Sequence, residues 1–333
     1  MTILSTHNTL QGYNFAGLPY RFTKNPIHIL DNIKKDAQYH RNQLWILFQD
    51  MSKAYDRVNL GMLQRALLRL QLPAEFVNLI FSLFAFRTNR VFTAHGTSPT
   101  YSVLSGIDQG EIISPILWCI YFDPLLYRAQ DIGLGYQLHV DSPLPHMDDT
   151  LWLSNSKIAL NQLMDIADSF YTLNSIQVNW TKSTLFAPLK NQNLVHFQLA
   201  SAPINLKPVK FTDSVRYLGI WFSMSHNKQF IQQQVQQEIH TACKTLMLKS
   251  ITDKQIIYIF NIVILPRLLY RTQLTFLGQK FCDRMMGSFR KILRTKLLFP
   301  KIPPFPHFIH HSSITYLICS IHRYKTRQLY LII

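Results

Sequence analysis

The chain reads LWILFQDMSKAYD from Leu44 to Asp56, and this stretch points to the fold. Apolar side chains occupy both the odd and the even positions before Asp50. This pattern predicts a strand over Gln43–Gln49 that is covered on both faces. The carboxylate of Asp50 would then face whatever lies beyond the end of the strand. A second interpretation stays open, in which Asp50 is a turn residue and Ser52 or Asp56 caps the next helix.

A second acidic segment, His146-Met147-Asp148-Asp149, precedes the apolar run Thr150 to Leu153. Two adjacent carboxylates repel each other, and a divalent cation offsets this repulsion when they are partly buried. A lone carboxylate at one strand end and an acidic pair in a turn can together hold two such ions. Two metals roughly 3.5–4 Å apart stabilise the attacking and leaving oxygens of a phosphoryl transfer. Taken alone, each segment is also typical of an ordinary turn.

The composition is that of a folded, basic protein. The 333 residues suit one elongated domain or two to three small ones, and the 47% of apolar residues can form a substantial core. Lysine and arginine number 34 against 18 acidic residues, which gives a formal net charge of +16. This excess favours a polyanionic partner, most simply nucleic acid, although a basic protein with no such partner has the same charge.

The four cysteines are isolated, without a CxxC pair. This spacing argues against a zinc site and a disulfide framework, and it suits a reducing compartment. The most apolar stretch, Ile256 to Tyr270, is interrupted by Asn261, Pro266 and Arg267. It is too short to span a bilayer, so we expect a buried helix there and no membrane partner.

Helical periodicity follows the first acidic segment. Leu63, Leu67 and Leu70 recur at helical spacing until Pro73, and a second helix is expected over Ala74–Phe86. The later expected elements are a hairpin of Arg90–His95 and Tyr101–Leu104 around Gly96, a helix to Tyr127 with Ser114 as N-cap and Pro115 at its first position, an amphipathic helix from Ser154 or Ser156 to Leu173, strands over Ser183–Ala187 and Val215–Phe222, and helices from Gln229 onward with a kink or break at Pro266. This order implies an α/β or α+β core followed by a helical part.

Between the acidic segments lies a glycine-containing turn, Gly106 to Pro115. Gly106 and Gly110 allow close approach of the backbone, and the amide of Gln109 can both donate and accept. A turn that runs into a helix start suits a flat ligand or a phosphate, but it is equally typical of an ordinary loop and cap.

In this order, the segments resemble the reverse transcriptase domain of non-LTR (LINE-like) retrotransposons. Asp-x-x-x-Ala-Tyr-Asp at 50–56 is similar to its first catalytic motif, and Gln109-Gly110-x-x-x-Ser114-Pro115 to the second. His146 to Asp149 resembles the third, Asn179-Trp180-Thr181-Lys182-Ser183 the fourth and Arg216-Tyr217-Leu218-Gly219 the fifth, the primer grip. Upstream, Gln11-Gly12-Tyr13 resembles the last part of the fingers. The motifs cover roughly residues 10–225.

The resemblance implies an α+β right-hand polymerase, with a palm of antiparallel strands, partial fingers and a helical thumb. It divides the chain into a remnant of fingers at 1–42, a palm at 43–225 that includes a partly fingers-like hairpin at 88–112, and a helical thumb or connection at 226–333. The implied activity is that of an RNA-directed DNA polymerase, which transfers a dNTP onto a primer 3′-hydroxyl. The implied partners are an RNA template, a DNA primer and a dNTP.

The resemblance also implies roles for particular residues. Asp50, Asp148 and Asp149 would surround two Mg²⁺ ions, with Mn²⁺ as the alternative ion, and the carbonyl of Met51 would assist. Tyr55 would lie under the incoming sugar and disfavour a 2′-hydroxyl. The remaining roles are nucleotide or template contact by Gln109 and Gly110, triphosphate contact by Lys182, and packing against the primer end by Tyr217, Leu218 and Gly219. Lys53 and Asp56 are expected to be structural.

Three departures from the family pattern stand out. His146 occupies a position usually held by an aromatic residue, and Pro143 and Pro145 interrupt the strand expected before Asp148. The chain also has few residues before Asp50, which suggests a truncated copy. An alternative function is therefore a catalytically degenerate remnant that binds nucleic acid. Another kind of palm polymerase, such as an intron maturase or a viral RNA polymerase, fits the Lys-Ala-Tyr-Asp and Tyr-Leu-Gly blocks less well.

Overall fold

The computed structural model describes residues 9–10, 22–136, 150–188, 193–225 and 229–296. The chain divides into two compact units. The first holds residues 1–218 and 222–225, and the second holds residues 219–221 and 226–333. The expected segments Gln11 to Tyr13, Val140 to Asp149 and Pro300 to Pro306 lie outside the described residues.

The first unit is built around an antiparallel sheet in the order β7-β1-β9. Its central strand β1 (Trp45–Gln49) is buried at every position, which confirms the strand expected from the sequence. β7 (Thr150–Ser154) and β9 (Thr184–Phe186) flank it. The other strands are β2 (Met51–Ser52), β3 (Arg87–Asn89), β4 (Phe92–Thr93), β5 (Gly96–Thr97), β6 (Tyr101–Val103), β8 (Gln177–Val178), β10 (Val195–Phe197), β11 (Ile204–Leu206) and β12 (Ser214–Tyr217). The residues of a further strand, β13 (Ile220–Ser223), fall partly in each unit.

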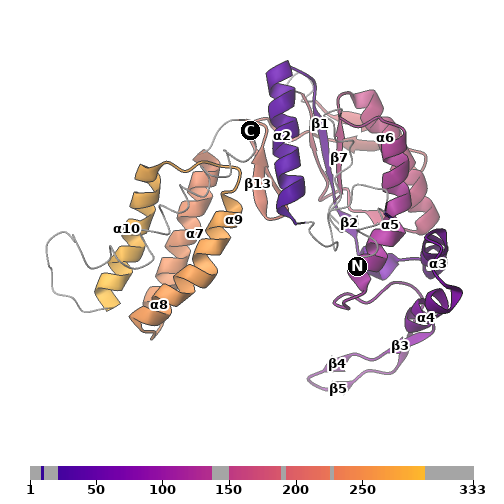
Figure 1. The fold of residues 1–333 in the computed structure, drawn as a ribbon, viewed down its shortest axis with the longest axis horizontal. Coiled ribbons are helices and arrows are strands. Elements are labelled where there is room, and N and C mark those ends of the chain that lie inside the picture. The colour runs from indigo at the N-terminus through magenta and orange to yellow at the C-terminus, as the bar shows by residue number, and fades with distance from the viewer. Residues whose placement is uncertain (1–8, 11–21, 137–149, 189–192, 226–228, 297–333) are drawn as a thin grey trace. The chain divides into compact units, whose positions relative to one another are not determined.

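The helices of this unit are α2 (Lys24–His40), α3 (Leu60–Arg69), α4 (Ala74–Phe84), α5 (Ser114–Asp131) and α6 (Lys157–Asn174), with a short 3₁₀ turn η1 (Tyr55–Arg57). Figure 1 shows α5 and α6 on one side of β1 and β7 and α2 on the other. Asn59 caps α3 by accepting from the amide of Met62, so neither Ser52 nor Asp56 is the cap. Ser156 caps α6 by accepting from Ala159, as expected.

Alternate residues of β1 pack on opposite faces of the sheet, as the pleat requires. Trp45 and Leu47 belong to the large cluster that includes side chains of α5 and α6. On the other face, the ring of Phe48 lies 6.0 Å from that of Phe186 and 5.3 Å from that of Tyr217. The strand is therefore held by cores on both sides, and its position is fixed.

Three expected elements differ from the structure. The expected strand over Val215–Phe222 is a hairpin, because Leu218 and Gly219 both have positive φ, 46° and 80°, and positive φ at two central residues closes a tight hairpin turn. At α5, the N-cap is Ile113, and Ser114 is the first helical residue with its hydroxyl buried. The expected hairpin of Arg90–His95 with Tyr101–Leu104 is instead two short pairs, because β6 pairs with Arg87–Asn89 in β3 and β4 pairs with β5.

The second unit is helical. It contains α7 (Gln229–Leu248), α8 (Asp253–Ile259), a π-helical segment η2 (Phe260–Ile264), α9 (Leu265–Arg271) and α10 (Gln279–Lys296). The break expected at Pro266 is present as this π-helical segment. Proline lacks an amide hydrogen and crowds the carbonyl four residues earlier, so the regular α-helix cannot continue through it. In the part of the chain that the structure describes, no helix is both long and apolar enough to cross a membrane.

Candidate active site

Asp50 stands where β1 ends and β2 begins. Its side chain is 33% exposed, although every residue of β1 is buried. Two hydrogen bonds hold the main chain of Asp50. The amide of Asn179 donates to the carbonyl oxygen of Asp50 at 2.8 Å, and the amide of Asp50 donates to Oγ of Ser183 at 3.2 Å. The carboxylate therefore projects from a fixed backbone at the end of the central strand.

At Asp50 the regular pairing of the strand with the facing chain is interrupted. Phe48 pairs with Thr184 in β9, whereas Met51 pairs with Val178 in β8. The facing chain thus supplies the intervening residues 179–183 as a loop opposite Asp50. Within this loop the hydroxyl of Ser183 donates to the carbonyl of Asn179 at 2.9 Å.

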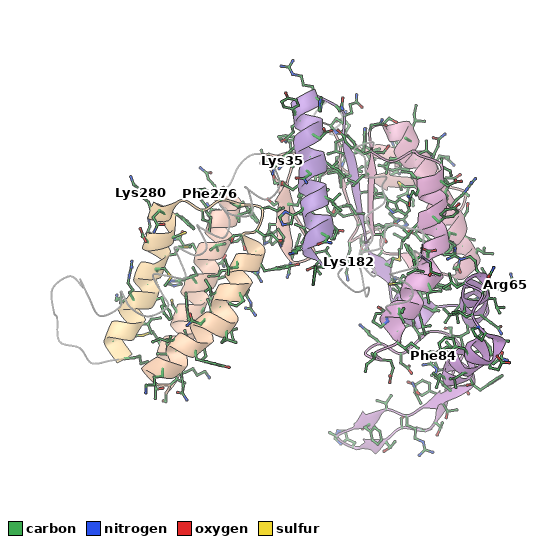
Figure 2. The ribbon with its side chains drawn as sticks, viewed as in Figure 1. Lys35, Arg65, Phe84, Lys182, Phe276 and Lys280 are labelled. Carbon is green, nitrogen blue, oxygen red and sulfur yellow. The ribbon has the colours of Figure 1, made fainter. Side chains whose placement is uncertain are left out.

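Lys182 projects from this loop toward the carboxylate. Its Nζ lies 4.0 Å from Oδ2 of Asp50, and its side chain is 71% exposed. Figure 2 labels Lys182 close to the end of the sheet where β1 runs into β2. An exposed ion pair of this length contributes little to folding, so the amine remains available for an anionic ligand.

A cavity of about 470 Å³ opens beside Asp50. It brings together three residues expected from the sequence, namely Asp50, Lys182 and Tyr217. The other lining residues are Phe48, Gln49, Thr150, Thr184, Val209, Asp213, Ser214, Val215 and Arg216. The cavity thus combines carboxylates, two cationic side chains and hydroxyls, a set suited to a phosphorylated ligand and a cation.

A buried polar network fixes the strand just behind Asp50. Oε1 of Gln49 accepts from Nε1 of Trp152 at 2.8 Å and from the hydroxyl of Tyr171 at 2.7 Å. Burial raises the pKa of Tyr171 well above its usual value, so this hydroxyl stays protonated and can donate. The network joins β1, β7 and α6, and it restricts movement of the strand end that carries Asp50.

The first and second motifs are joined through their main chains. The amide of Ile107 donates to the carbonyl of Tyr55, and the amide of Gly106 donates to that of Val58, both at 2.9 Å. The ring of Tyr55 lies 5.8 Å from that of Trp118 in α5. Tyr55 is therefore held between the Asp50 segment and the glycine-containing turn.

Gln109 and Gly110 are exposed in the loop before α5. Gly110 has a φ of 103°, and a Cβ at this position would meet nothing within 4 Å. Neither residue lines the cavity beside Asp50. Their contact with a nucleotide or template stays a prediction.

The fifth motif forms the turn between β12 and β13. Tyr217 is 5% exposed, whereas Leu218 and Gly219 make the turn itself. Asp148 and Asp149 lie outside the described residues, as does His146. Within the described ranges, no group of three or more His, Cys, Asp or Glu residues is placed to hold a metal ion. The metal-binding triad stays a prediction.

Sequence reasoning missed several residues around Asp50. Ser183 and Asn179 were noted as part of a motif, but their bonds to the main chain of Asp50 were not anticipated. Thr150, Thr184 and Asp213 line the cavity without having been singled out. For Thr150 a signal existed, since it directly follows the acidic pair in the sequence.

Residues 4–222 match the family model described as reverse transcriptase (RNA-dependent DNA polymerase). The chain belongs to the reverse transcriptase family. Members of this family copy a nucleic-acid template and generally use divalent metal ions.

Curated relatives are polyproteins of R2 retrotransposable elements, which are non-LTR elements. The chain is 21% identical over 254 residues to the Pol polyprotein of the type-2 element R2DM from Drosophila melanogaster, covering 74% of this chain and 24% of that protein. It is 22% identical over 231 residues to the Pol polyprotein of a type-1 R2 element from Popillia japonica, covering 67% and 38%. The match spans 24% and 38% of the lengths of these two relatives.

Among solved structures, telomerase from Candida albicans, in complex with a TWJ fragment of telomeric RNA, matches with a TM-score of 0.50. The sequence identity is 11%, and the match covers 90% of this chain and 46% of that chain. This likeness shows the fold, an α+β right-hand polymerase. The fold class expected from the sequence is confirmed.

Proposed function

We propose that the chain is an RNA-directed DNA polymerase that adds a dNTP to a DNA primer on an RNA template by two-metal nucleotidyl transfer. Its family supplies the reaction class, and the site around Asp50 supplies the candidate residues. The observation that carries the proposal is the register of the central sheet. Gln49, which precedes Asp50, pairs with Thr150, which follows Asp149 in the sequence.

This pairing limits how far apart the residues bonded to Gln49 and Thr150 can lie. Directly opposed residues of an antiparallel pair have Cα atoms about 4.5–5.5 Å apart, and consecutive Cα atoms are about 3.8 Å apart. Asp50 directly follows Gln49 and Asp149 directly precedes Thr150 in the sequence, and this adjacency supports the proposal of a common site at one end of the sheet. We therefore assign Asp50, Asp148 and Asp149 to one site, assisted by the carbonyl of Met51.

The donor set suits magnesium, because Mg²⁺ binds through one or two carboxylates and substrate phosphates. Bound there, two Mg²⁺ or Mn²⁺ ions would supply activation of the primer hydroxyl and stabilisation of the departing pyrophosphate. The chain's own residues position the reactants. Lys182 offsets triphosphate charge, Tyr55 excludes a 2′-hydroxyl, Gln109 and Gly110 contact the nucleotide or template, and the turn at Tyr217, Leu218 and Gly219 packs against the primer end.

Primer extension tests the proposal. The full chain is incubated with Mg²⁺, dNTPs and a labelled DNA primer annealed to RNA or DNA templates. We expect extension by the unaltered protein, and a loss of at least about 100-fold in Asp50→Asn and Asp148→Asn with template–primer affinity retained. Asp131→Asn is the matched control, because its carboxylate is exposed at the end of α5 and pairs with Arg128. Normal extension by Asp148→Asn would contradict the site assignment.

A second candidate is a protein that binds nucleic acid without catalysis. The sequence observation in its favour is His146 and the two prolines just before the acidic pair, because a protonated imidazole disfavours cation binding. Template–primer binding that weakens steeply with salt, combined with no extension in Mg²⁺ or Mn²⁺, would support this candidate over the polymerase.

A further inference from the structure

Ser183 occupies a place where the sheet loses its regular hydrogen bonds. Between Phe48 and Met51 the central strand advances by three residues, while its partners change from Thr184 to Val178. The extra residues of the facing chain leave the main chain at Asp50 without a regular ladder partner. An unpaired backbone amide is unfavourable once water is excluded, so this amide needs another acceptor.

The hydroxyl of Ser183 supplies that acceptor. It receives the amide hydrogen of Asp50 at 3.2 Å and donates its own hydrogen to the carbonyl of Asn179 at 2.9 Å. The amide of Asn179 in turn donates to the carbonyl of Asp50 at 2.8 Å. These three bonds close a ring through Asp50, Asn179 and Ser183. Ser183 is 7% exposed, so water has little access to its hydroxyl.

We infer that Ser183 is a positioning residue for the metal-binding carboxylate of Asp50, which it holds through the backbone amide. This inference rests on the proposed function, since it takes Asp50 as a metal ligand. A hydrogen bond to the amide fixes the direction in which Cα and the carboxylate leave the strand. Partners of metal ligands commonly change metal affinity or activity by about 10- to 100-fold when they are removed.

The same ring places Lys182 beside Asp50. Lys182 directly precedes Ser183, and its amide bonds to the carbonyl of Asn179 at 3.2 Å. One loop therefore sets both the acidic ligand and the amine 4.0 Å from it. Removing the Ser183 hydroxyl would loosen the carboxylate and the amine together, whereas removing another hydroxyl of the loop would not.

The test measures metal binding and catalysis separately in the full chain. Mn²⁺ affinity is measured from the electron paramagnetic resonance signal of free Mn²⁺ with template–primer present, and primer extension is followed across a Mg²⁺ titration. For Ser183→Ala we expect Mn²⁺ affinity to fall by about 10-fold or more and the Mg²⁺ requirement to rise by a similar factor. Template–primer affinity should not change. Hydrogen exchange in the peptide containing Asp50 should be faster.

Two variants serve as controls. Ser183→Thr keeps the hydroxyl and should retain most of the metal affinity. Thr181→Val removes another hydroxyl of the same loop. This hydroxyl donates to Oδ1 of Asn179 at 2.7 Å and not to Asp50. The variant should therefore behave as the unaltered protein. If Ser183→Ala does not fold, Ser183→Cys replaces it, since a thiol fills the space but accepts a hydrogen bond only weakly.

The outcomes separate this inference from the proposed function. Equal Mn²⁺ affinity and an equal Mg²⁺ requirement in Ser183→Ala and the unaltered protein would overturn the positioning role alone. If the unaltered protein binds Mn²⁺ but extends no primer, the proposed function fails, and the comparison of Mn²⁺ affinities still decides the role of Ser183. If the unaltered protein binds no Mn²⁺, both are overturned.

Discussion

Gly106 lies against the main chain of Asp56. A Cβ at Gly106 would lie 2.7 Å from the carbonyl oxygen of Asp56, closer than any ordinary contact. The φ of Gly106 is 89°, a region that residues with a side chain rarely adopt. Because the obstructing atoms belong to the backbone, they cannot rotate away. The contact between the Asp50 segment and the turn before α5 therefore requires glycine at this position.

We expect Gly106→Ala to destabilise the protein by more than about 1–3 kcal/mol, the usual cost of a strained backbone, because it adds a clash to the strain. The measurement is the free energy of unfolding in urea. Gly96→Ala is the control, since Gly96 also has positive φ, 120°, but a Cβ there would meet nothing within 4 Å. Equal losses in the two variants would show that the contact with Asp56 is unimportant.

The Lys182 amine is expected to act on the nucleotide and to contribute little to stability. A charged hydrogen bond to a phosphate is worth about 1.5–3 kcal/mol, so Lys182→Met should raise the KM for dNTP by about 10-fold or more. Its unfolding free energy should change by less than about 1 kcal/mol, because the pair with Asp50 is exposed. Steady-state kinetics and urea unfolding measure the two effects.

Lys157→Met is the control for that prediction, because Lys157 is an exposed lysine in the first turn of α6. It should leave both quantities unchanged. An unaltered KM in Lys182→Met would remove Lys182 from the nucleotide site.

Tyr55 is expected to discriminate against ribonucleotides through the bulk of its ring. The ring is held in place by Trp118 at 5.8 Å, so it cannot easily move aside for a 2′-hydroxyl. Tyr55→Val should therefore narrow the preference for dNTP over rNTP by about 10- to 100-fold in kcat/KM. Tyr55→Phe keeps the ring and should preserve the preference. The prediction fails if both variants discriminate as well as the unaltered protein.

Alkaline pH should destabilise the fold through Tyr121. Burial raises the pKa of Tyr121 to about 12, and the hydrogen bond from the amide of Asn59 acts in the opposite direction. In the unfolded chain a tyrosine ionises near pH 10, so the unfolded state loses this proton first. The stability that Tyr121 contributes is thus fully present below about pH 10 and declines as the pH rises toward about 12.

Urea unfolding between about pH 8 and about pH 11 measures this dependence. Tyr121→Phe removes the titrating group, so its unfolding free energy should fall less steeply above about pH 10 than that of the unaltered protein. At neutral pH the variant should lose about 0.5–1.5 kcal/mol, because the Tyr121 hydroxyl also donates to the carbonyl of Asn174. Parallel pH curves for the two proteins would contradict the role of Tyr121.

The sequence could predict the elements whose signal is local. The strand ending at Asp50 follows from apolar residues at consecutive positions, and the helix capped by Ser156 follows from its periodicity. The order of the motifs also predicted the polymerase fold. The strand and the helix depend on neighbours within one or two turns of the chain, whereas the fold followed from the resemblance of widely spaced motifs to a known family.

The remaining features depend on contacts between distant segments. The hydroxyl of Ser183 accepts from the amide of Asp50, which lies 133 positions earlier, and no local sequence pattern predicts that bond. At α5, the amide of Ser114 bonds to the carbonyl of Glu111 at 3.2 Å, and the amides of Ile116 and Leu117 both bond to that of Ile113. The turn before the helix thereby makes Ser114 its first residue and buries the hydroxyl that was expected to cap it.

The hairpin at Leu218 and Gly219 was overlooked for a related reason. Leucine seldom adopts positive φ, so an apolar run containing Leu218 suggested one continuous strand. The loop from Asn179 to Ser183 differs, because its motif is recognisable in the sequence but its hydrogen bonds to the main chain of Asp50 are not.

The hydrogen bonds that hold Asp50 involve its amide and carbonyl groups, which every substitution except proline retains. The carboxylate can therefore be replaced while the surrounding architecture persists. Under the proposed function, an inactivating change at this position would leave a well-folded protein. The amount of folded protein would then be a poor guide to how much of it is active.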